Sequence, residues 1–155
     1  MKKSILAVTL VACAFLSGCA TYQAGGVSAA EQLKRFEPVP GKASIYVCRI
    51  PAMLSARGVK TVVYVDNEAI GTLRQNSFVH TIIEPGKHGV LLRHDGLGSG
   101  SGGFESFEVA AGEVRFFWVG VTGKGWGVLT VDNFDTVADA RKCVVGAEYS
   151  VPTAE

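Results

Sequence analysis

Short segments in which apolar and polar residues alternate follow one another along most of the chain. In residues 59–66, for example, valine or threonine occupies every second position, and mainly lysine, valine and tyrosine fill the positions between. Side chains of a β-strand alternate between its two faces, so a period of two residues indicates a strand with one buried face. The segments that read as strands are 43–50, 59–66, 69–73, 78–84, 88–94, 104–109, 113–122 and 126–131.

The residues between these segments favour tight turns. Asp66-Asn67-Glu68, Pro85-Gly86, Ala111-Gly112 and Gly123-Lys124-Gly125 each separate two predicted strands. Because no helix-length segments separate the strands, we predict a mainly β fold, an antiparallel β-sandwich (or a small barrel) of about seven to nine short strands. Segment 113–122 is apolar at successive positions, which indicates burial on both faces in the middle of the sandwich.

A short helix is predicted near the C-terminus. Asp132 or Asn133 can act as its N-cap, and apolar positions then recur until Cys143. A second helix of one or two turns fits residues 28–36, with Ser28 as N-cap and a glutamate three residues later. The expected fold class is therefore a mainly β sandwich with a short C-terminal helix.

The first residues have the composition of a secretory signal peptide. Lys2 and Lys3 precede an almost unbroken apolar run, 5–16, which is shorter than the roughly 20 residues of a membrane-spanning helix. Leu16-Ser17-Gly18-Cys19 resembles a lipobox, the signature at which bacterial lipoproteins are acylated on cysteine and cut just before it. The resemblance implies a mature chain that begins at lipid-modified Cys19. The alternative is an ordinary signal peptide followed by an incidental cysteine.

Lipid on Cys19 would anchor the protein to a membrane of the cell envelope, facing the periplasm. In enterobacterial lipoproteins an aspartate after the cysteine retains the protein at the inner membrane, and here Ala20 follows, so the outer membrane is expected. The expected organisation is a signal peptide (1–18), a lipidated N-terminus and linker (19–42), a β-sandwich domain (43–150) and a tail (151–155).

The charge of the chain does not point to a nucleic-acid ligand. Fifteen Lys and Arg residues stand against fourteen Asp and Glu, without a basic run. Removal of residues 1–18 takes away two lysines and no acid, which leaves the charges nearly balanced. Nucleic-acid binding needs clustered positive charge, so we expect no nucleic-acid partner.

Two cysteines remain when Cys13 leaves with the signal peptide and Cys19 carries lipid. Cys48 and Cys143 form an even pair in an oxidising compartment, for which the simplest interpretation is a disulfide. Two buried free thiols are the alternative, because spacing alone does not bring the residues together. A two-cysteine metal site is less favoured, since no Cys-x-x-Cys or His-x-x-x-His spacing accompanies them.

Three segments carry a resemblance to a known family. Residues 44–49 (SIYVCR), 63–73 (VYVDNEAIGTL) and 83–88 (IEPGKH) resemble the opening strand, a hairpin and a turn of the small bacterial lipoproteins of domain of unknown function 2846. The hairpin and turn are also similar to PEGA-type β-sandwich modules of envelope proteins. The resemblance implies a fold and a location in the envelope, but no catalytic residue. Cys48 stands where the family usually has an aromatic or aliphatic residue, which fits a disulfide particular to this branch.

Candidate catalytic and metal-binding residues are few. His80, His88 and His94 are the histidines of the chain, and the last two share a strand face about 20 Å apart at roughly 3.3 Å per residue. This distance is too long for two ligands of one metal. His80 could face either of them from a neighbouring strand, but surface or core histidines are the favoured interpretation, and we expect no metal and no other cofactor. His94-Asp95 with a serine could suggest a hydrolase, but the chain lacks a Gly-x-Ser-x-Gly elbow.

Binding is the function that the sequence favours. The glycine-rich stretch Gly96–Gly103, with Gly100 at its centre, could become ordered against a partner, and Trp126 beside two glycines is a candidate contact. Trp118 lies in the most apolar segment and is expected in the core. We therefore expect a non-enzymatic, lipid-anchored envelope lipoprotein that binds an envelope protein or a glycan. The alternatives are a small periplasmic hydrolase or metal-dependent enzyme, and an inhibitor or secretion-system accessory lipoprotein.

Overall fold

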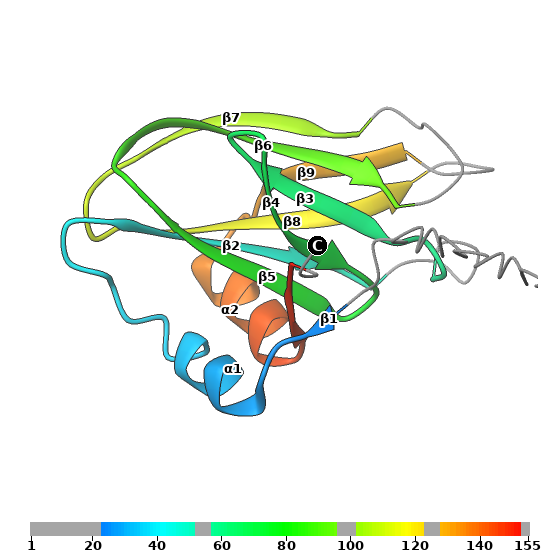
Figure 1. Ribbon diagram of the computed structural model, residues 1–155, viewed down its shortest axis with the longest axis horizontal. Coiled ribbons are helices and arrows are strands. Elements are labelled where there is room, and N and C mark those ends of the chain that lie inside the picture. The colour runs from blue at the N-terminus through cyan, green and yellow to red at the C-terminus, as the bar shows by residue number, and fades with distance from the viewer. Residues whose placement is uncertain (1–22, 52–56, 96–101, 123–127, 153–155) are drawn as a thin grey trace, which may run out of the picture.

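The computed structural model describes residues 23–51, 57–95, 102–122 and 128–152 (Figure 1). Cys19, Gly100 and Trp126, which the sequence nominates for lipidation and binding, lie outside the described residues. The elements are β1 (Gln23–Ala24), α1 (Val27–Leu33), β2 (Ala43–Arg49), β3 (Thr61–Val65), β4 (Glu68–Leu73), β5 (Ser77–Ile83), β6 (Gly86–His94), β7 (Phe104–Val109), β8 (Val114–Thr122), β9 (Val128–Asn133), α2 (Val137–Val145) and β10 (Glu148–Val151).

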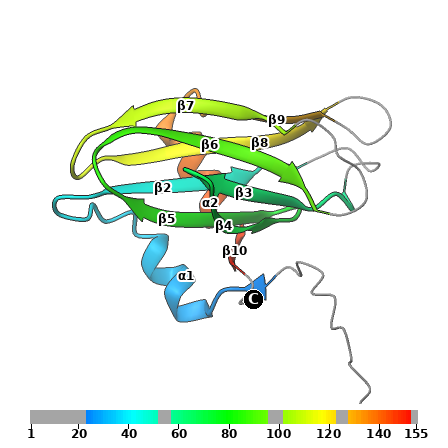
Figure 2. The ribbon, with the colours of Figure 1, turned by 45° about the horizontal axis from the view of Figure 1, so that its top comes forward.

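Two β-sheets face each other, and both helices lie on the outer side of one of them (Figures 1 and 2). The larger sheet has the strand order β1-β10-β5-β2-β8-β9, and the smaller one has the order β4-β3-β6-β7. The prediction of a mainly β, sandwich-like fold with a short C-terminal helix is confirmed, with ten strands among the described residues. No helix in this part of the chain has the length and hydropathy to cross a membrane.

Two pairs of strands differ from the antiparallel arrangement expected. β2 runs parallel to β8, with Ser44 opposite Val114, and β5 runs parallel to β10. A parallel neighbour requires a long connection. Between β2 and β8 the chain forms β5 and the four strands of the smaller sheet. Between β5 and β10 it forms β6 to β9 and helix α2.

The hairpin between β3 and β4 forms where the sequence predicts it. Val65 pairs with Glu68, and the two residues between them, Asp66 and Asn67, have φ angles of 50° and 71°. A two-residue turn with positive φ at both positions matches the twist of a hairpin, and Asn and Asp tolerate this conformation better than most residues. This turn places Asp66 and Asn67 beside the start of β6.

The side chains of β2 alternate between two hydrophobic cores. Ile45 and Val47 lie in a core between the sheets, and Tyr46 and Cys48 lie in a second core under the helices, which we call the helix-side core. The helix-side core contains Phe36, Tyr46, Cys48, Phe78, Phe116, Ala140, Val144 and Ala147. β8 likewise contributes to both cores, so the prediction that its segment is buried on both faces is confirmed.

The C-terminal helix begins later than predicted. Its N-cap is Thr136, whose hydroxyl accepts a hydrogen bond from the Asp139 N–H at 3.1 Å. Asp132 and Asn133 are not available as caps because β9 extends through Asn133, which pairs with Phe117 of β8. The predicted cap at these two residues was therefore wrong, because both belong to strand β9.

The stretch expected as a linker, residues 19–42, contributes structure from Gln23 onward. β1 pairs with β10, α1 follows it, and the buried Phe36 ring contacts Tyr46 edge-on at a centroid distance of 5.4 Å. Helix α1 has Gly26 at its N-cap position, two residues before the predicted cap, and it has no side-chain N-cap. Ser28, predicted as the cap, lies inside the helix.

Trp118 also lies elsewhere than expected. Its ring is half-buried on the helix side of the larger sheet, close to Gly120, and its indole N–H donates to the Asn133 carbonyl at 2.9 Å. The strand alternation places Phe117 and Val119 between the sheets, so Trp118 must point to the opposite face.

Candidate functional site

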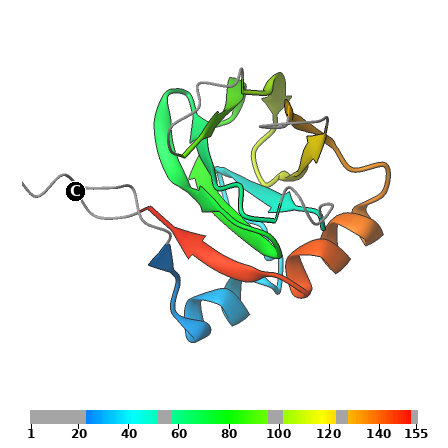
Figure 3. The same ribbon diagram turned by 90° about the vertical axis from the view of Figure 1, so that its right-hand side faces the viewer.

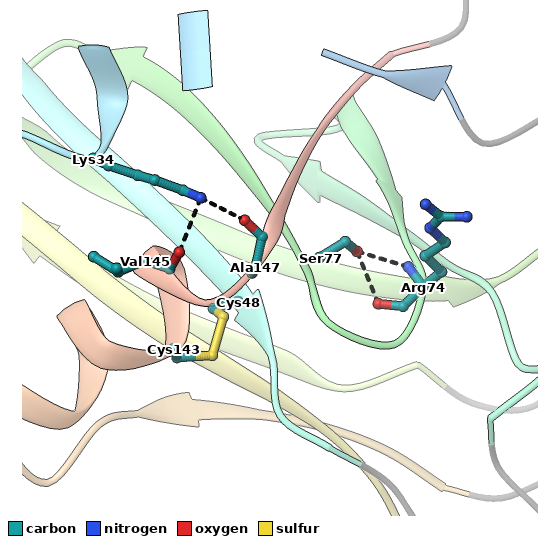
Figure 4. Close-up of a disulfide and its surroundings, with 7 residues drawn as sticks. All are labelled: Lys34, Cys48, Arg74, Ser77, Cys143, Val145 and Ala147. Carbon is teal, nitrogen blue, oxygen red and sulfur yellow. Dashed lines mark hydrogen bonds between the residues drawn. A yellow bond between two sulfur atoms is a disulfide. The ribbon is translucent and has the colours of Figure 1, made fainter. Parts of the chain in front are cut away.

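A disulfide between Cys48 and Cys143 joins β2 to α2 (Figure 4). The two Cα atoms are 6.3 Å apart and the residues are separated by 95 positions in the sequence. Cys48 is fully buried, and Cys143 packs against the same helix-side core. The structure thus forms the pair that cysteine counting predicts, in place of two free thiols.

Lys34, just after α1, connects the N-terminal segment to the end of α2. Its ammonium group donates to the carbonyl oxygens of Val145 and Ala147 at 3.0 and 2.8 Å (Figure 4). The last carbonyls of a helix lack intrahelical partners and carry partial negative charge, so a cation there stabilises the helix end. The charged group of Lys34 is therefore part of the scaffold.

The three histidines lie apart. His80 in β5 packs on the Tyr46 ring at a centroid distance of 4.5 Å, and His88 at the start of β6 contacts Asp66. His94 ends β6 opposite Thr61, and both its Nε2 atom and the Thr61 hydroxyl are buried without a hydrogen-bond partner among the described residues. No group of three possible metal ligands occurs in that part of the chain. Ser99 and Ser101, the serines nearest His94-Asp95, lie outside it.

Burial shifts the pKa values of His80, Tyr46 and Arg49. Loss of hydration lowers the pKa of His80 to about 4, so the ring is neutral near pH 7. Burial, with a contribution from Tyr149, raises the pKa of the neighbouring Tyr46 to about 12. Arg49, at 1% exposure, has a pKa lowered by burial and donates to the Val59 carbonyl from the end of β2.

Asp66 and His88 hold the β3–β4 hairpin against β6. One Asp66 oxygen lies 2.5 Å from His88 Nδ1, and the other accepts the Gly89 N–H at 3.0 Å. The second ring nitrogen of His88 donates to the Glu84 carbonyl at 2.9 Å. Partial burial raises the pKa of the Asp66 carboxyl, but the hydrogen bonds from His88 and Gly89 outweigh it and the net shift is downward. The pair therefore fixes the position of the β3–β4 turn relative to β6.

A hollow of about 340 Å³ opens beside this pair on the outer face of the smaller sheet. We call it the Phe104 hollow, and its lining residues are Asp66, Asn67, Lys87, His88, Gly89, Leu91 and Phe104. Phe104 starts β7 and pairs with Leu91 of β6, yet it is 64% exposed. The lining thus combines the apolar side chains of Phe104 and Leu91 with amide, ammonium, imidazole and carboxylate groups.

Gly89 shapes this hollow. A Cβ atom at Gly89 would lie 2.8 Å from the edge of the Phe104 ring, so the ring occupies the space that a side chain would need. Phe104 leans diagonally across the strand pair onto the bare backbone of Gly89, an arrangement in which an aromatic ring covers a strand glycine. The position of the ring therefore depends on the absence of a side chain there.

Two other hollows are less suited to binding. One of about 380 Å³ lies beside the disulfide, where Ile50, Pro51 and Phe134 contribute to its lining. The other, about 320 Å³, lies at the N-terminus of α2. Asp139 and Thr136 on their rims are already used to cap α2. The Phe104 hollow differs because a largely exposed aromatic side chain lies there beside polar groups.

Replacing Gly89 by alanine should move the Phe104 ring without unfolding the domain. The ring is exposed and can swing away from the new methyl group, while a strand glycine is itself unfavourable by roughly 0.5–1 kcal/mol. We expect the free energy of unfolding to change by less than about 1 kcal/mol. Urea denaturation measures this change, and NMR contacts between the Phe104 ring and residue 89, compared between the native chain and the variant, report the ring position. An unchanged ring position would contradict the geometry.

The sequence did not nominate the residues of the Phe104 hollow. Its binding candidates Trp126 and Gly100 lie outside the described residues, although Phe104 directly follows the glycine-rich stretch 96–103. A signal was present in the predicted strand 104–109. In that strand Phe104 shares a face with Ser106 and Glu108, while Phe107 and Val109 face the core. An aromatic residue on the polar face of a strand indicates a contact surface.

Residues 40–123 match the model of a family described as "Protein of unknown function (DUF2846)". The matched range includes β2 to β8 and with them every residue that lines the Phe104 hollow. No curated protein and no solved structure matches the chain.

Proposed function

The chain belongs to the DUF2846 family, and from this premise we propose that it is a lipid-anchored, non-enzymatic binding domain of the bacterial cell envelope. Its ligand in this proposal is a saccharide of the envelope, bound in the Phe104 hollow. The observation that carries the proposal is the Phe104 ring, which is 64% exposed and lines the hollow together with polar side chains.

A saccharide fits the chemistry of the hollow. The face of a pyranose ring carries C–H groups that pack on an aromatic ring, while its hydroxyl groups need donors and acceptors. Phe104 and Leu91 provide the apolar wall, and Asn67 and Lys87 provide hydrogen-bond donors on the rim. Lys87 also favours sugars that carry carboxylate or phosphate groups, which are attracted to an ammonium ion.

The roles of two histidines favour binding over hydrolysis. His88 has both ring nitrogens bonded within the turn, to Asp66 and to the Glu84 carbonyl. His80 packs on Tyr46 in a buried position where its neutral form is favoured. A general base must reach the proton that it removes, and neither ring is placed to do so in the hollow. A small hydrolase is the alternative function, and it predicts turnover of the bound saccharide.

Phe104→Ser should weaken saccharide binding by about tenfold or more, as expected for loss of an aromatic contact at the centre of a site. The full chain, extracted in mild detergent, is mixed with peptidoglycan sacculi and, separately, with lipopolysaccharide, and the bound fraction is measured. Gly89→Ala should weaken the same binding because it displaces the ring.

Val128→Ser is the matched control for this test, because Val128 in β9 is also an exposed apolar residue, at 54%. Binding that is equally weak in Val128→Ser, or no binding to either saccharide, would overturn the proposed ligand. Cross-linking in cells covers the other class of partner. If the native chain captures a protein that Phe104→Ser does not capture, the ligand of the hollow is a protein and not a saccharide.

A further inference from the structure

The described part of the chain begins close to Cys19. Gln23 and Ala24 form β1, which pairs antiparallel with β10 so that Gln23 lies opposite Val151. The Gly25 N–H then donates to the Tyr149 carbonyl at 2.7 Å, and the Tyr149 ring lies across Gly25. β10 is in turn held to β4 by a buried hydrogen bond from Ser150 to the Thr72 carbonyl. The fold therefore holds the chain from Gln23 onward.

Three residues separate Cys19 from Gln23. Four Cα-to-Cα steps of at most about 3.5 Å give a reach of roughly 14 Å between these two residues. The headgroup layer of one leaflet is roughly 5–8 Å thick, so a chain acylated at Cys19 starts within or beside it. A domain attached by so short a segment has Gln23 within about 14 Å of the acylated residue.

The residues nearest this tether carry no charged side chain, and the first charged residue after them is the exposed Glu31, one turn after Val27 in α1. Residues 23–30 contain no Asp, Glu, Lys or Arg, and neither do Val151 and Pro152 beside them. Val27, the first residue of α1, is 77% exposed. Placing charged groups against lipid is costly, whereas small, neutral and apolar side chains enter the headgroup layer at little cost.

We infer that this edge, residues 23–30 with Val151 and Pro152, lies against the lipid surface of the membrane, with Val27 in the headgroup layer. The inference rests on the proposed lipid anchor at Cys19, and we call this surface the membrane edge. The acyl chains supply the affinity, and the membrane edge sets the orientation of the domain.

This orientation turns the Phe104 hollow away from the membrane. α1 and β1 lie on one side of the molecule and β7 lies on the opposite side in both views (Figures 1 and 2). The view from the side shows β1, α1 and β10 together along one margin (Figure 3). A ligand in the periplasm could therefore reach Phe104 while the domain rests on the lipid.

The test uses the full acylated chain in vesicles of phosphatidylethanolamine and phosphatidylglycerol. Val27→Cys and, as control, Val128→Cys are labelled with an environment-sensitive fluorophore, without reductant so that the Cys48–Cys143 disulfide remains closed. Some vesicles contain lipid with a nitroxide quencher near the headgroup. We expect the probe at position 27 to shift to shorter wavelength and to be quenched by the nitroxide lipid, and the probe at position 128 to show neither effect.

A spacer variant tests the role of the short tether. A Gly-Ser insertion of about twelve residues before Gln23 adds a flexible reach of roughly 18–20 Å, and it should reduce quenching at position 27. Equal quenching at both positions, or none at position 27, would overturn the inference. A wavelength shift that depends on protein concentration, and not on the nitroxide lipid, would also overturn it, since a second copy of the chain would then cover the edge.

Failure of the anchor is distinguishable from failure of the orientation. Flotation of the vesicles shows whether the chain is lipid-bound at all, and Cys19→Ser should abolish flotation. A chain that does not float contradicts the proposed anchor. A chain that floats, but whose probe at position 27 is not quenched, contradicts only the membrane edge.

Discussion

Removing the Cys48–Cys143 disulfide is expected to lower the free energy of unfolding by about 2–5 kcal/mol, the usual cost for a small domain. The bridge closes a loop of 95 positions, and in the chain-entropy model a loop near 100 residues is worth about 4.7 kcal/mol. The loss of unfolding free energy lies in the lower part of this range if the reduced chain retains structure.

The position of the bridge adds a second reason for a large effect. Cys48 lies in a central strand of the larger sheet and Cys143 in α2, so the bond attaches the helix directly to the sheet. α2 is also attached by the burial of Ala140 and Val144, by the Lys34 contact at its end and by the Arg141 guanidinium over the Phe36 ring. A nine-residue helix is marginal without tertiary contacts, so α2 should loosen first when the bridge is absent.

Guanidinium denaturation of the Cys48→Ala/Cys143→Ala variant measures this cost, with the native chain in the presence and absence of reductant beside it. Val145→Ala is the matched control in α2, because Val145 is exposed and its loss should leave stability nearly unchanged. A midpoint for the double variant equal to that of the oxidised native chain would contradict the expectation. Equal destabilisation by Val145→Ala would assign the effect to the helix and not to the bridge.

The strands were predictable because their burial repeats with the period of a strand. β3 and β7 have one buried face, and the turn residues Asp66 and Asn67 are among the few that adopt positive φ. The disulfide followed from counting cysteines, since the bonded pair consists of the two that remain when Cys13 and Cys19 are assigned to the predicted signal peptide and lipid site. Local chemistry dictates each of these features.

The missed elements depend on contacts that no local pattern encodes. β10 has four residues directly after a helix, and it becomes a strand because β5 and β1 lie on either side of it. Phe36 is buried because the helix-side core has space for its ring, although it lies in a stretch of linker-like composition. The prediction of an N-cap at Asp132 or Asn133 was wrong for the same reason, since Asn133 pairs with Phe117 of β8.

The candidate site was predictable only in part. Its turn, Asp66-Asn67, and its strand, 104–109, both emerge from the sequence, and the exposed position of Phe104 follows from the strand alternation. The hollow itself does not, because it requires β6 to lie between β3 and β7 and requires Gly89 to lie under the Phe104 ring. Register between strands is a property of the assembled sheet.

Acidification from pH 7 to pH 4 is expected to destabilise the domain through His80 by about 2–3 kcal/mol. Burial lowers the pKa of this ring from 6.5 in the unfolded chain to about 4 in the folded one. Above pH 6.5 the ring is neutral in both states, and its contribution to stability is fully present. As the pH falls through 6.5 the unfolded state takes up a proton that the folded state does not, so stability declines until the ring is protonated in both states near pH 4.

The non-titrating variant His80→Gln isolates this contribution. The free energy of unfolding is measured by urea denaturation between pH 7 and pH 4 for the native chain and the variant, and the variant should lose less stability over this interval. The pKa of Asp66 is lowered in the fold, so its protonation also destabilises the domain at acid pH. This effect is the same in both chains and cancels in the comparison. His94→Gln is the control histidine in the other sheet. Parallel curves for the native chain and His80→Gln, or an equal flattening by His94→Gln, would show that the acid sensitivity does not come from the ring packed on Tyr46.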